Sequence, residues 1–130
     1  MEITKLEPNQ IFVFGSNTAG RHGRGAAKQA YSDFGAVYGI GEGLTGQCYA
    51  FPTLNWLGRL VKRSWAELTT SRDLLYEVCL DNPNKSFLLT KVGCGLAGYN
   101  EADMRSLFIN DAPSNLILPE DWRMSYESST

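Results

Sequence analysis

Two short glycine-rich segments contain residue types that bind phosphate. Of the 13 glycines, nine lie between Gly15 and Gly46, and three more are Gly93, Gly95 and Gly98. Glycine lets another molecule approach the main chain closely and adopts conformations that other residues avoid. Main-chain N–H groups exposed in this way attract anions, above all where a loop leads into the N-terminus of a helix. Both segments are therefore predicted to bind phosphate.

The first segment also concentrates positive charge. Arg21, His22, Arg24 and Lys28 lie close together in a chain whose formal net charge is −2. Two loops from two strands would hold a pyrophosphate from both sides, with each charge-assisted contact contributing ~1.5–3 kcal/mol. The alternative is that the glycines serve only tight turns and close helix–sheet packing. Residues 37–46, which contain glycine at positions 39, 41, 43 and 46, are expected to be an ordered loop, and for this loop a structural turn and a pocket wall are equally open.

The sequence lacks the motifs of the commonest nucleotide enzymes. It contains no GxxxxGK[ST], so a P-loop kinase or ATPase is not expected. The spacing Gly20-x-x-Gly23-x-Gly25 differs from the dinucleotide motif GxGxxG, which argues against a nicotinamide oxidoreductase. Three widely spaced cysteines and a single histidine do not make a zinc site or a disulfide framework. We expect no metal and no cofactor.

Length and composition indicate one intracellular domain. A chain of 130 residues, 43% hydrophobic and 20% charged, fits a single domain with its own core. The apolar runs fall far short of the ~20 residues that span a bilayer, and the first residues show no signal-peptide pattern. A slightly acidic total argues against a protein whose main work is coating nucleic acid or membranes. We therefore expect a cytoplasmic protein.

Each glycine segment lies between a predicted strand and a predicted helix. Residues 11–14 are typical of a short strand, and residues 25–35 of a helix. Residues 86–92 form the strand before the second segment. Asn100 is placed as the N-cap of a helix that reaches about Ile109, with Asp103 at the capping-box position.

The remaining chain predicts further elements of both kinds. Residues 47–52 and 115–118 are typical of strands, and residues 53–62 are expected to be irregular. Ser64 is placed to cap a helix that reaches about Leu80 and has an apolar face made of Trp65, Leu68, Leu75, Val78 and Cys79. Two strand–loop–helix units together with these strands predict the α/β class, with helices on the faces of a sheet.

Three blocks of sequence resemble the macro domain family. They are NTAGRHGRGAA from Asn17, YAFP from Tyr49 and KVGCGLAG from Lys91. They follow one another in the family's order across most of the chain, from about Ile11 to Pro119, and the closest likeness is to short macro-like proteins of phages and bacteria. The resemblance implies a compact three-layer α/β/α domain with a mixed sheet over residues 1–125. Residues 126–130 are expected to be a flexible tail.

The resemblance implies a site for ADP-ribose or a related nucleotide. Asn17 would be the hydrogen-bond partner of the distal ribose, and Glu2 is a weak match to the acid that reads the adenine amino group. The two loops would hold the distal ribose and the diphosphate. Their residues are Gly15, Ser16, Asn17, Gly20, Arg21, His22, Gly23, Arg24 and Gly25, and then Gly93, Cys94, Gly95, Leu96, Ala97, Gly98 and Tyr99.

The chain departs from the hydrolytic branches of the family. The branch with the most similar loops has a lysine shortly after the first loop and an acid in the second. Here Tyr31 and Ser32 follow the first loop, and Ala97 stands where the acid would be. Other hydrolytic macro domains have an aspartate in the first loop, where this chain has Arg24. Whether the protein is an enzyme is therefore open.

A few local side chains remain as candidates for chemistry. His22 is a candidate acid–base, or a loop histidine that adds positive charge. Cys94 is a nucleophile if a helix N-terminus lowers its pKa, and otherwise a small residue that fills space. Tyr99 either contacts a ribose or packs in the core. The tryptophans Trp56, Trp65 and Trp122 are expected to pack rather than to stack on a base.

Three functions follow from these observations. The first is a module that binds ADP-ribose, free or on a macromolecule. The second is a hydrolase of ADP-ribosyl linkages or ADP-ribose phosphate esters that uses His22, or a ligand-held water together with Asn17. The third is a nucleic-acid-associated domain that uses residues 21–24 and the cations Arg59, Lys62 and Arg63; the acidic total charge disfavours it. A phage-encoded protein acting in a bacterial host cytoplasm is one setting that the resemblance suggests.

Overall fold

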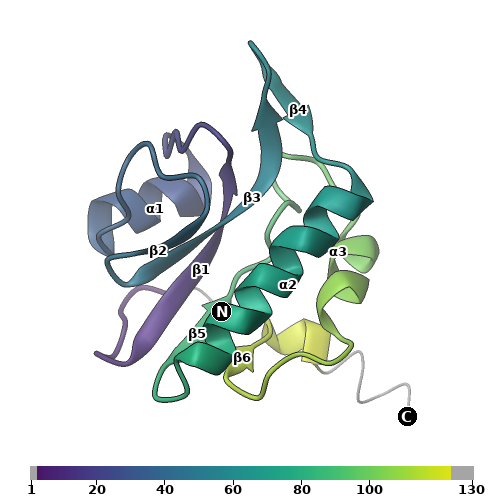
Figure 1. Cartoon of the computed structure of the whole chain (residues 1–130). Coiled ribbons are helices and arrows are strands. Elements are labelled where there is room, and N and C mark those ends of the chain that lie inside the picture. The colour runs from purple at the N-terminus through teal and green to yellow at the C-terminus, as the bar shows by residue number, and fades with distance from the viewer. Residues whose placement is uncertain (1–2, 124–130) are drawn as a thin grey trace.

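The computed structural model describes residues 3–123, which form one mixed sheet with helices on both faces (Figure 1). The strand order is β2-β3-β1-β5-β6, and β4 pairs with β3 beside this path. The elements in chain order are β1 (Gln10–Asn17), α1 (Gly25–Asp33), β2 (Gly43–Thr45), β3 (Cys48–Trp56), β4 (Leu60–Lys62), α2 (Trp65–Asp81), β5 (Ser86–Leu89), α3 (Glu101–Phe108) and β6 (Leu116–Ile117). The predicted α/β class is confirmed.

The central strands run parallel. β1 lies between β3 and β5 and is parallel to both, and β6 is parallel to β5. β2 and β4 pair antiparallel with β3 at its two ends. The carboxyl ends of β1, β3 and β5 therefore meet at one edge of the sheet.

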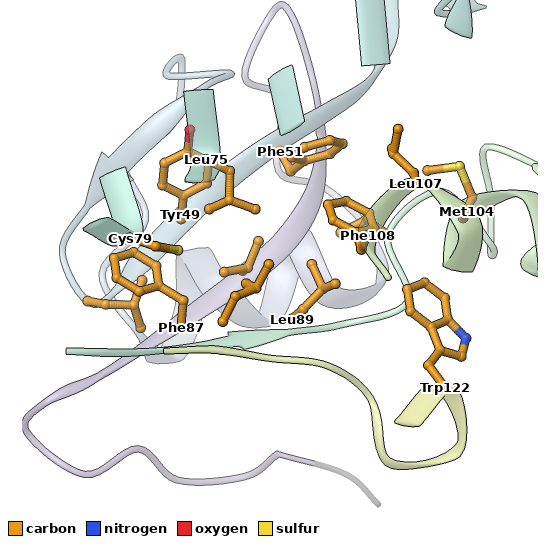
Figure 2. Close-up of a cluster of buried hydrophobic side chains, with 14 of the residues drawn as sticks. Tyr49, Phe51, Leu75, Cys79, Phe87, Leu89, Met104, Leu107, Phe108 and Trp122 are labelled. Carbon is orange, nitrogen blue, oxygen red and sulfur yellow. The ribbon is translucent and has the colours of Figure 1, made fainter. Parts of the chain in front are cut away.

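Side chains that alternate along β1 build two separate cores. Ile11 and Val13 point to the face covered by α2 and α3, whereas Phe12 and Phe14 point to the face covered by α1. The larger core gathers residues from β1, β3, β5, α2 and α3 around Phe108 (Figure 2). Central strands that are buried on both faces explain the unbroken apolar run at residues 11–14.

The long helix begins where the sequence predicts. Ser64 caps α2: its side chain accepts a hydrogen bond from the N–H of Glu67, whose carboxylate accepts one from the N–H of Ser64. The predicted apolar face is right for Leu68, Leu75 and Cys79, which are buried. It is wrong for Trp65, which is half exposed because it lies at the first helical position, beyond the edge of the core.

Two predictions about the segments around β3 are wrong. Residues 53–62 are not irregular: β3 continues to Trp56 and turns back into β4 through Gly58, which has a φ of 76°. Residues 37–46 are not entirely a loop, because β2 adds to the edge of the sheet. At the other side, the predicted strand 86–92 ends at Leu89, where pairing with β1 stops.

Three remaining predictions concern membrane-spanning segments, the C-terminal tail and Glu2. Within residues 3–123, no helix has the length and apolar character needed to cross a membrane. The tail predicted at residues 126–130 and the adenine-side residue Glu2 lie outside the described residues.

Candidate functional site

The sheet topology creates a crevice between the two glycine loops. β1 and β5 are parallel neighbours, and the chain leaves β1 toward α1 on one face and β5 toward α3 on the other. Loops that depart to opposite faces from the carboxyl ends of adjacent strands leave a gap between them, which is where ligands bind in α/β sheets.

A cavity of about 540 Å³ occupies this position. Its wall contains most of the residues predicted for the site: Gly15, Ser16, Asn17, Arg21, Gly23, Arg24, Gly25, Gly93, Gly95, Leu96 and Ala97. The two loops, about 70 residues apart in sequence, therefore meet at one cavity. Its volume lies in the range of ligand pockets, roughly 300–1,000 Å³.

The N-terminus of α1 presents free donors to this cavity. The first hydrogen bond at this helix end runs from the N–H of Lys28 to the carbonyl of Arg24. Gly25, Ala26 and Ala27 precede it, so their N–H groups have no partner in the helix, and the N-cap Arg24 provides no side-chain cap. All three residues line the cavity. The positive end of the helix dipole is thus directed at an uncapped, open site.

The second loop contributes a similar set of donors. A turn is closed by the N–H of Gly98, which donates to the carbonyl of Gly95 at 3.0 Å. Among the residues at positions 3–123, none accepts a hydrogen bond from the N–H of Gly95, Leu96 or Ala97. These three residues also line the cavity.

Two cavity glycines have no structural reason to be glycine. The φ angles of Gly23 and Gly95 are not positive, and a Cβ atom at either position would meet nothing within 4 Å. By contrast, Gly20 has a φ of 69°, and its Cβ would lie 2.3 Å from the carbonyl carbon of Gly39. Gly20 therefore serves the packing of the loop, whereas Gly23 and Gly95 keep the cavity wall open.

Asn17 lies in the wall and also holds the first loop together. Its side-chain amide donates to the carbonyl of Arg21 at 3.0 Å, and its side-chain oxygen accepts from the N–H of Arg21 at 3.1 Å. An amide has two N–H groups and two lone pairs, so one donor and one acceptor position remain for a ligand.

His22 does not line the cavity. Its side chain is 2% exposed and lies edge-on between the rings of Phe14 and Tyr38. Burial lowers the pKa of His22, opposed in part by the main chain of Ile40. Among the described residues, neither ring nitrogen has a hydrogen-bond partner. The predicted acid–base group is therefore a neutral imidazole inside an aromatic cluster behind the loop.

The other candidates for chemistry also lie behind the cavity wall. Burial raises the pKa of Cys94, the opposite of what a nucleophilic thiolate requires. The Tyr99 hydroxyl oxygen lies 2.8 Å from the carbonyl oxygen of Thr53 and 2.9 Å from that of Arg63, so its single O–H is shared between these two acceptors. Its ring would lie 2.9 Å from a Cβ atom on Gly93, so Tyr99 supports the second loop from beneath.

A second cavity of about 690 Å³ adjoins the first. Ala26, Thr90 and Lys91 belong to the walls of both. The second wall is mostly apolar; it includes Ile3, Phe12, Leu88, Leu89, Ile117, Leu118 and Pro119. Polar side chains at the wall include Gln29, Glu120, Asp121 and Arg123.

Lys91, at the junction of the cavities, is held by two carboxylates. Its Nζ lies 2.6 Å from Asp121 Oδ2 and 2.9 Å from Glu101 Oε1. Hydrogen bonds to Asp121 and then to Glu101 raise the pKa of Lys91. This pairing links the second loop to α3 and to the helical turn at residues 120–123.

Several wall residues were not predicted as site residues. They are Ala26, Ala27, Tyr38, Thr53, Leu54, Leu60, Thr90, Lys91 and Val92. Thr53 and Leu54 could have been inferred, because they extend a strand parallel to the strand before the first loop. Tyr38 and Leu60 come from a loop and a hairpin whose positions only the folded chain shows. Within residues 37–46, Tyr38 lines the pocket, whereas Gly41 and Gly46 approach the main chain of Asn17 and Gly35 too closely for a side chain, so the segment is both a structural turn and a part of the pocket wall.

Comparison with protein-family models, with curated proteins and with solved structures finds no match to this chain. The likeness to macro domains therefore rests on the sequence blocks around the two loops.

Proposed function

We propose that this protein binds ADP-ribose, or a closely related nucleotide with a diphosphate, between its two glycine loops. The observation that carries the proposal is the convergence of free main-chain donors on one cavity: Gly25, Ala26 and Ala27 on one side, and Gly95, Leu96 and Ala97 on the other. Unpaired N–H groups from two loops that line one open crevice fit an anion with two charged centres.

The two adjoining cavities fit the rest of such a ligand. The diphosphate would lie between the loops, near Ala26. The apolar second cavity, with Phe12 and Leu88 in its wall, suits a nucleobase, which needs a flat, water-poor surface. The wall of the first cavity also has polar groups on Asn17 and Thr53 that suit the hydroxyls of a terminal ribose.

Charge at the first cavity also favours a diphosphate. Arg21 and Arg24 are exposed at its wall, and neither forms an ion pair within residues 3–123. Their charges remain available to a phosphate at a helix N-terminus that already favours anions.

The lining favours binding over hydrolysis. Among the described residues that line the first cavity, none is Asp, Glu, His or Cys. General acid–base or nucleophilic cleavage would have to use the remaining polar groups of the wall, such as Ser16, Tyr38 and Lys91, and Lys91 is already paired with two carboxylates. The proposal therefore places the protein among macro-like binding modules with a three-layer α/β/α arrangement.

Isothermal titration calorimetry with ADP-ribose tests the proposal. We expect saturable 1:1 binding, and weaker binding of AMP, which lacks the second phosphate and the distal ribose. Ribose 5-phosphate, which lacks the base, is also expected to bind more weakly. The absence of any heat of binding with millimolar ADP-ribose would overturn the proposal.

A further inference from the structure

The cations of this chain are concentrated in two segments. Residues 8–32 and 43–66 contain six of the 12 Lys and Arg residues and none of the 14 Asp and Glu residues. The six are Arg21, Arg24, Lys28, Arg59, Lys62 and Arg63. These segments carry the first glycine loop and the β3–β4 hairpin, so an otherwise acidic protein has a basic region beside the mouth of its cavity.

The β3–β4 hairpin extends the cavity wall outward. Leu54 pairs with Lys62, and Trp56 pairs with Leu60, so these four side chains lie on one face of the hairpin. Leu54 and Leu60 line the first cavity. Trp56 continues the same face toward the tip, and Figure 1 shows the hairpin projecting beyond the rest of the molecule. This face forms a continuous path from the cavity to the tip.

The outer part of this face presents an aromatic ring and a guanidinium. Arg21 lies over the ring of Trp56, with its Cζ 4.3 Å from the ring centroid. The N–H of Trp56 donates to Thr18 Oγ1 at 2.8 Å, which ties the hairpin to the first loop. Trp56 is 38% exposed and Leu57, at the turn, is 71% exposed. Contrary to the expectation that it packs, Trp56 is therefore partly open to solvent, as is the aliphatic side chain of Leu57, on a protruding element.

The exposed cations surround this face. Arg59 lies in the hairpin turn, Arg24 at the start of α1, and Lys62 at the foot of the hairpin. Lys62 Nζ donates to the carbonyl of Gly98 at 2.9 Å, which uses one of its three N–H groups. Arg63 is excluded from this set because its guanidinium is bonded to Asn55, Pro52 and Ser71.

We propose that the face defined by Leu54, Trp56, Leu60 and Lys62, with Arg21, Arg24 and Arg59 around it, binds single-stranded nucleic acid. An exposed aromatic ring among cations is the combination that single strands require: bases stack on the ring or on the guanidinium plane, and the cations contact phosphates. A duplex does not fit, because its bases are stacked inside and cannot reach Trp56.

The chemistry favours this partner over an acidic peptide. Acidic side chains would pair with the cations but would leave Trp56 and Leu57 without a partner. Nucleobases cover both. This binding goes beyond the proposed function. The hairpin face shares Leu54, Leu60, Arg21 and Arg24 with the wall of the first cavity, whereas Trp56, Arg59 and Lys62 lie outside that wall and serve only the nucleic acid.

Fluorescence anisotropy with a labelled 12-nucleotide oligothymidylate tests the proposal. We expect micromolar binding at 50 mM salt, with a slope of log K against log salt of about −2 to −3 for three to four phosphate contacts. Trp56→Ala is expected to weaken binding about 5- to 150-fold, the range for loss of one stacked base. Arg59→Glu is expected to weaken binding and to make the salt slope shallower.

Matched variants and competitors make the result decisive. Lys85→Glu reverses a charge at the opposite end of the sheet, before β5, and is expected to leave binding unchanged. Calorimetry with ADP-ribose on Trp56→Ala shows whether the cavity is intact. The proposal is overturned if the oligonucleotide does not bind, if Trp56→Ala and Lys85→Glu bind equally well, or if a duplex or a polyglutamate peptide of equal charge competes as strongly as unlabelled oligothymidylate.

Discussion

The substitution Gly95→Val tests whether Gly95 is needed for ligand binding or for folding. Gly95 lies in the cavity wall, its φ is not positive, and a Cβ atom there meets nothing within 4 Å. The valine side chain would therefore project into the space proposed for the diphosphate without strain in the protein. It would prevent a phosphate from reaching the N–H groups of Gly95 and Leu96.

The expected size of the effect follows from the lost contacts. Each charge-assisted hydrogen bond is worth ~1.5–3 kcal/mol, so loss of one contact weakens ADP-ribose binding about 10- to 150-fold. Folding stability should change by less than about 0.5 kcal/mol, because the site is open and the backbone is unstrained. Calorimetry with ADP-ribose measures the first quantity, and the thermal unfolding midpoint monitors the second.

Two further variants serve as controls for the Gly95→Val measurement. Gly93→Ala places a Cβ atom 2.9 Å from the Tyr99 ring at a φ of 78°, so we expect it to lower the unfolding midpoint as well as affinity. Ala66→Val adds bulk to an exposed position of α2 and should leave affinity unchanged. If Gly95→Val binds ADP-ribose as tightly as the wild-type protein, the amides of the second loop do not hold the phosphate.

Three further changes test the structure around the site. Burial lowers the pKa of His22 below its usual 6.5, so the stability that the neutral imidazole contributes is present above pH 6.5 and is lost as pH falls through the folded-state pKa. His22→Phe should therefore reduce the fall in the thermal unfolding midpoint between pH 7.5 and pH 5. An unchanged pH profile of the unfolding midpoint would contradict this. Tyr99→Phe leaves two carbonyls with one partner fewer and should cost about 1–3 kcal/mol in a denaturant titration, with a loss of ADP-ribose affinity because the second loop loosens. Ser64→Ala removes half of a capping box and should cost about 1 kcal/mol, whereas Ser114→Ala in an exposed turn should cost less than about 0.5 kcal/mol.

Local sequence signals predicted the parts of the fold that depend on neighbours in the chain. The strand at residues 11–14, the helix that begins at Gly25, the cap at Ser64 and the N-cap at Asn100 are all present. Such features depend on residues within one or two turns of each other, so their patterns can be read directly.

The β3–β4 hairpin escaped prediction because its strands have weak local signals. Residues 53–56 continue a strand past Pro52, and β4 has only the three residues Leu60–Lys62. Pairing between β3 and β4, together with the bond from Trp56 to Thr18, holds this element in place. These contacts depend on how the chain is folded and not on a repeating pattern.

The chemistry of individual side chains also depended on packing. His22, between two glycines in a basic loop, appeared in the sequence as an accessible acid–base, yet its ring is buried against Phe14 and Tyr38. Arg21 is next to His22 in the chain but lies on the exposed face, over Trp56. Adjacent residues in a loop point in directions that only the surrounding contacts determine.

The amino-acid sequence by itself determined that this chain has two phosphate-type glycine loops, each between a strand and a helix, because glycine content, apolar periodicity and caps are local properties. The tertiary structure alone decided that the loops share one cavity, that an apolar cavity adjoins it and that a basic hairpin borders its mouth. Those facts follow from β1 lying between β3 and β5 and from the packing of segments that are far apart in the chain. Strand order is set by contacts between residues far apart in the chain, and no local pattern encodes it.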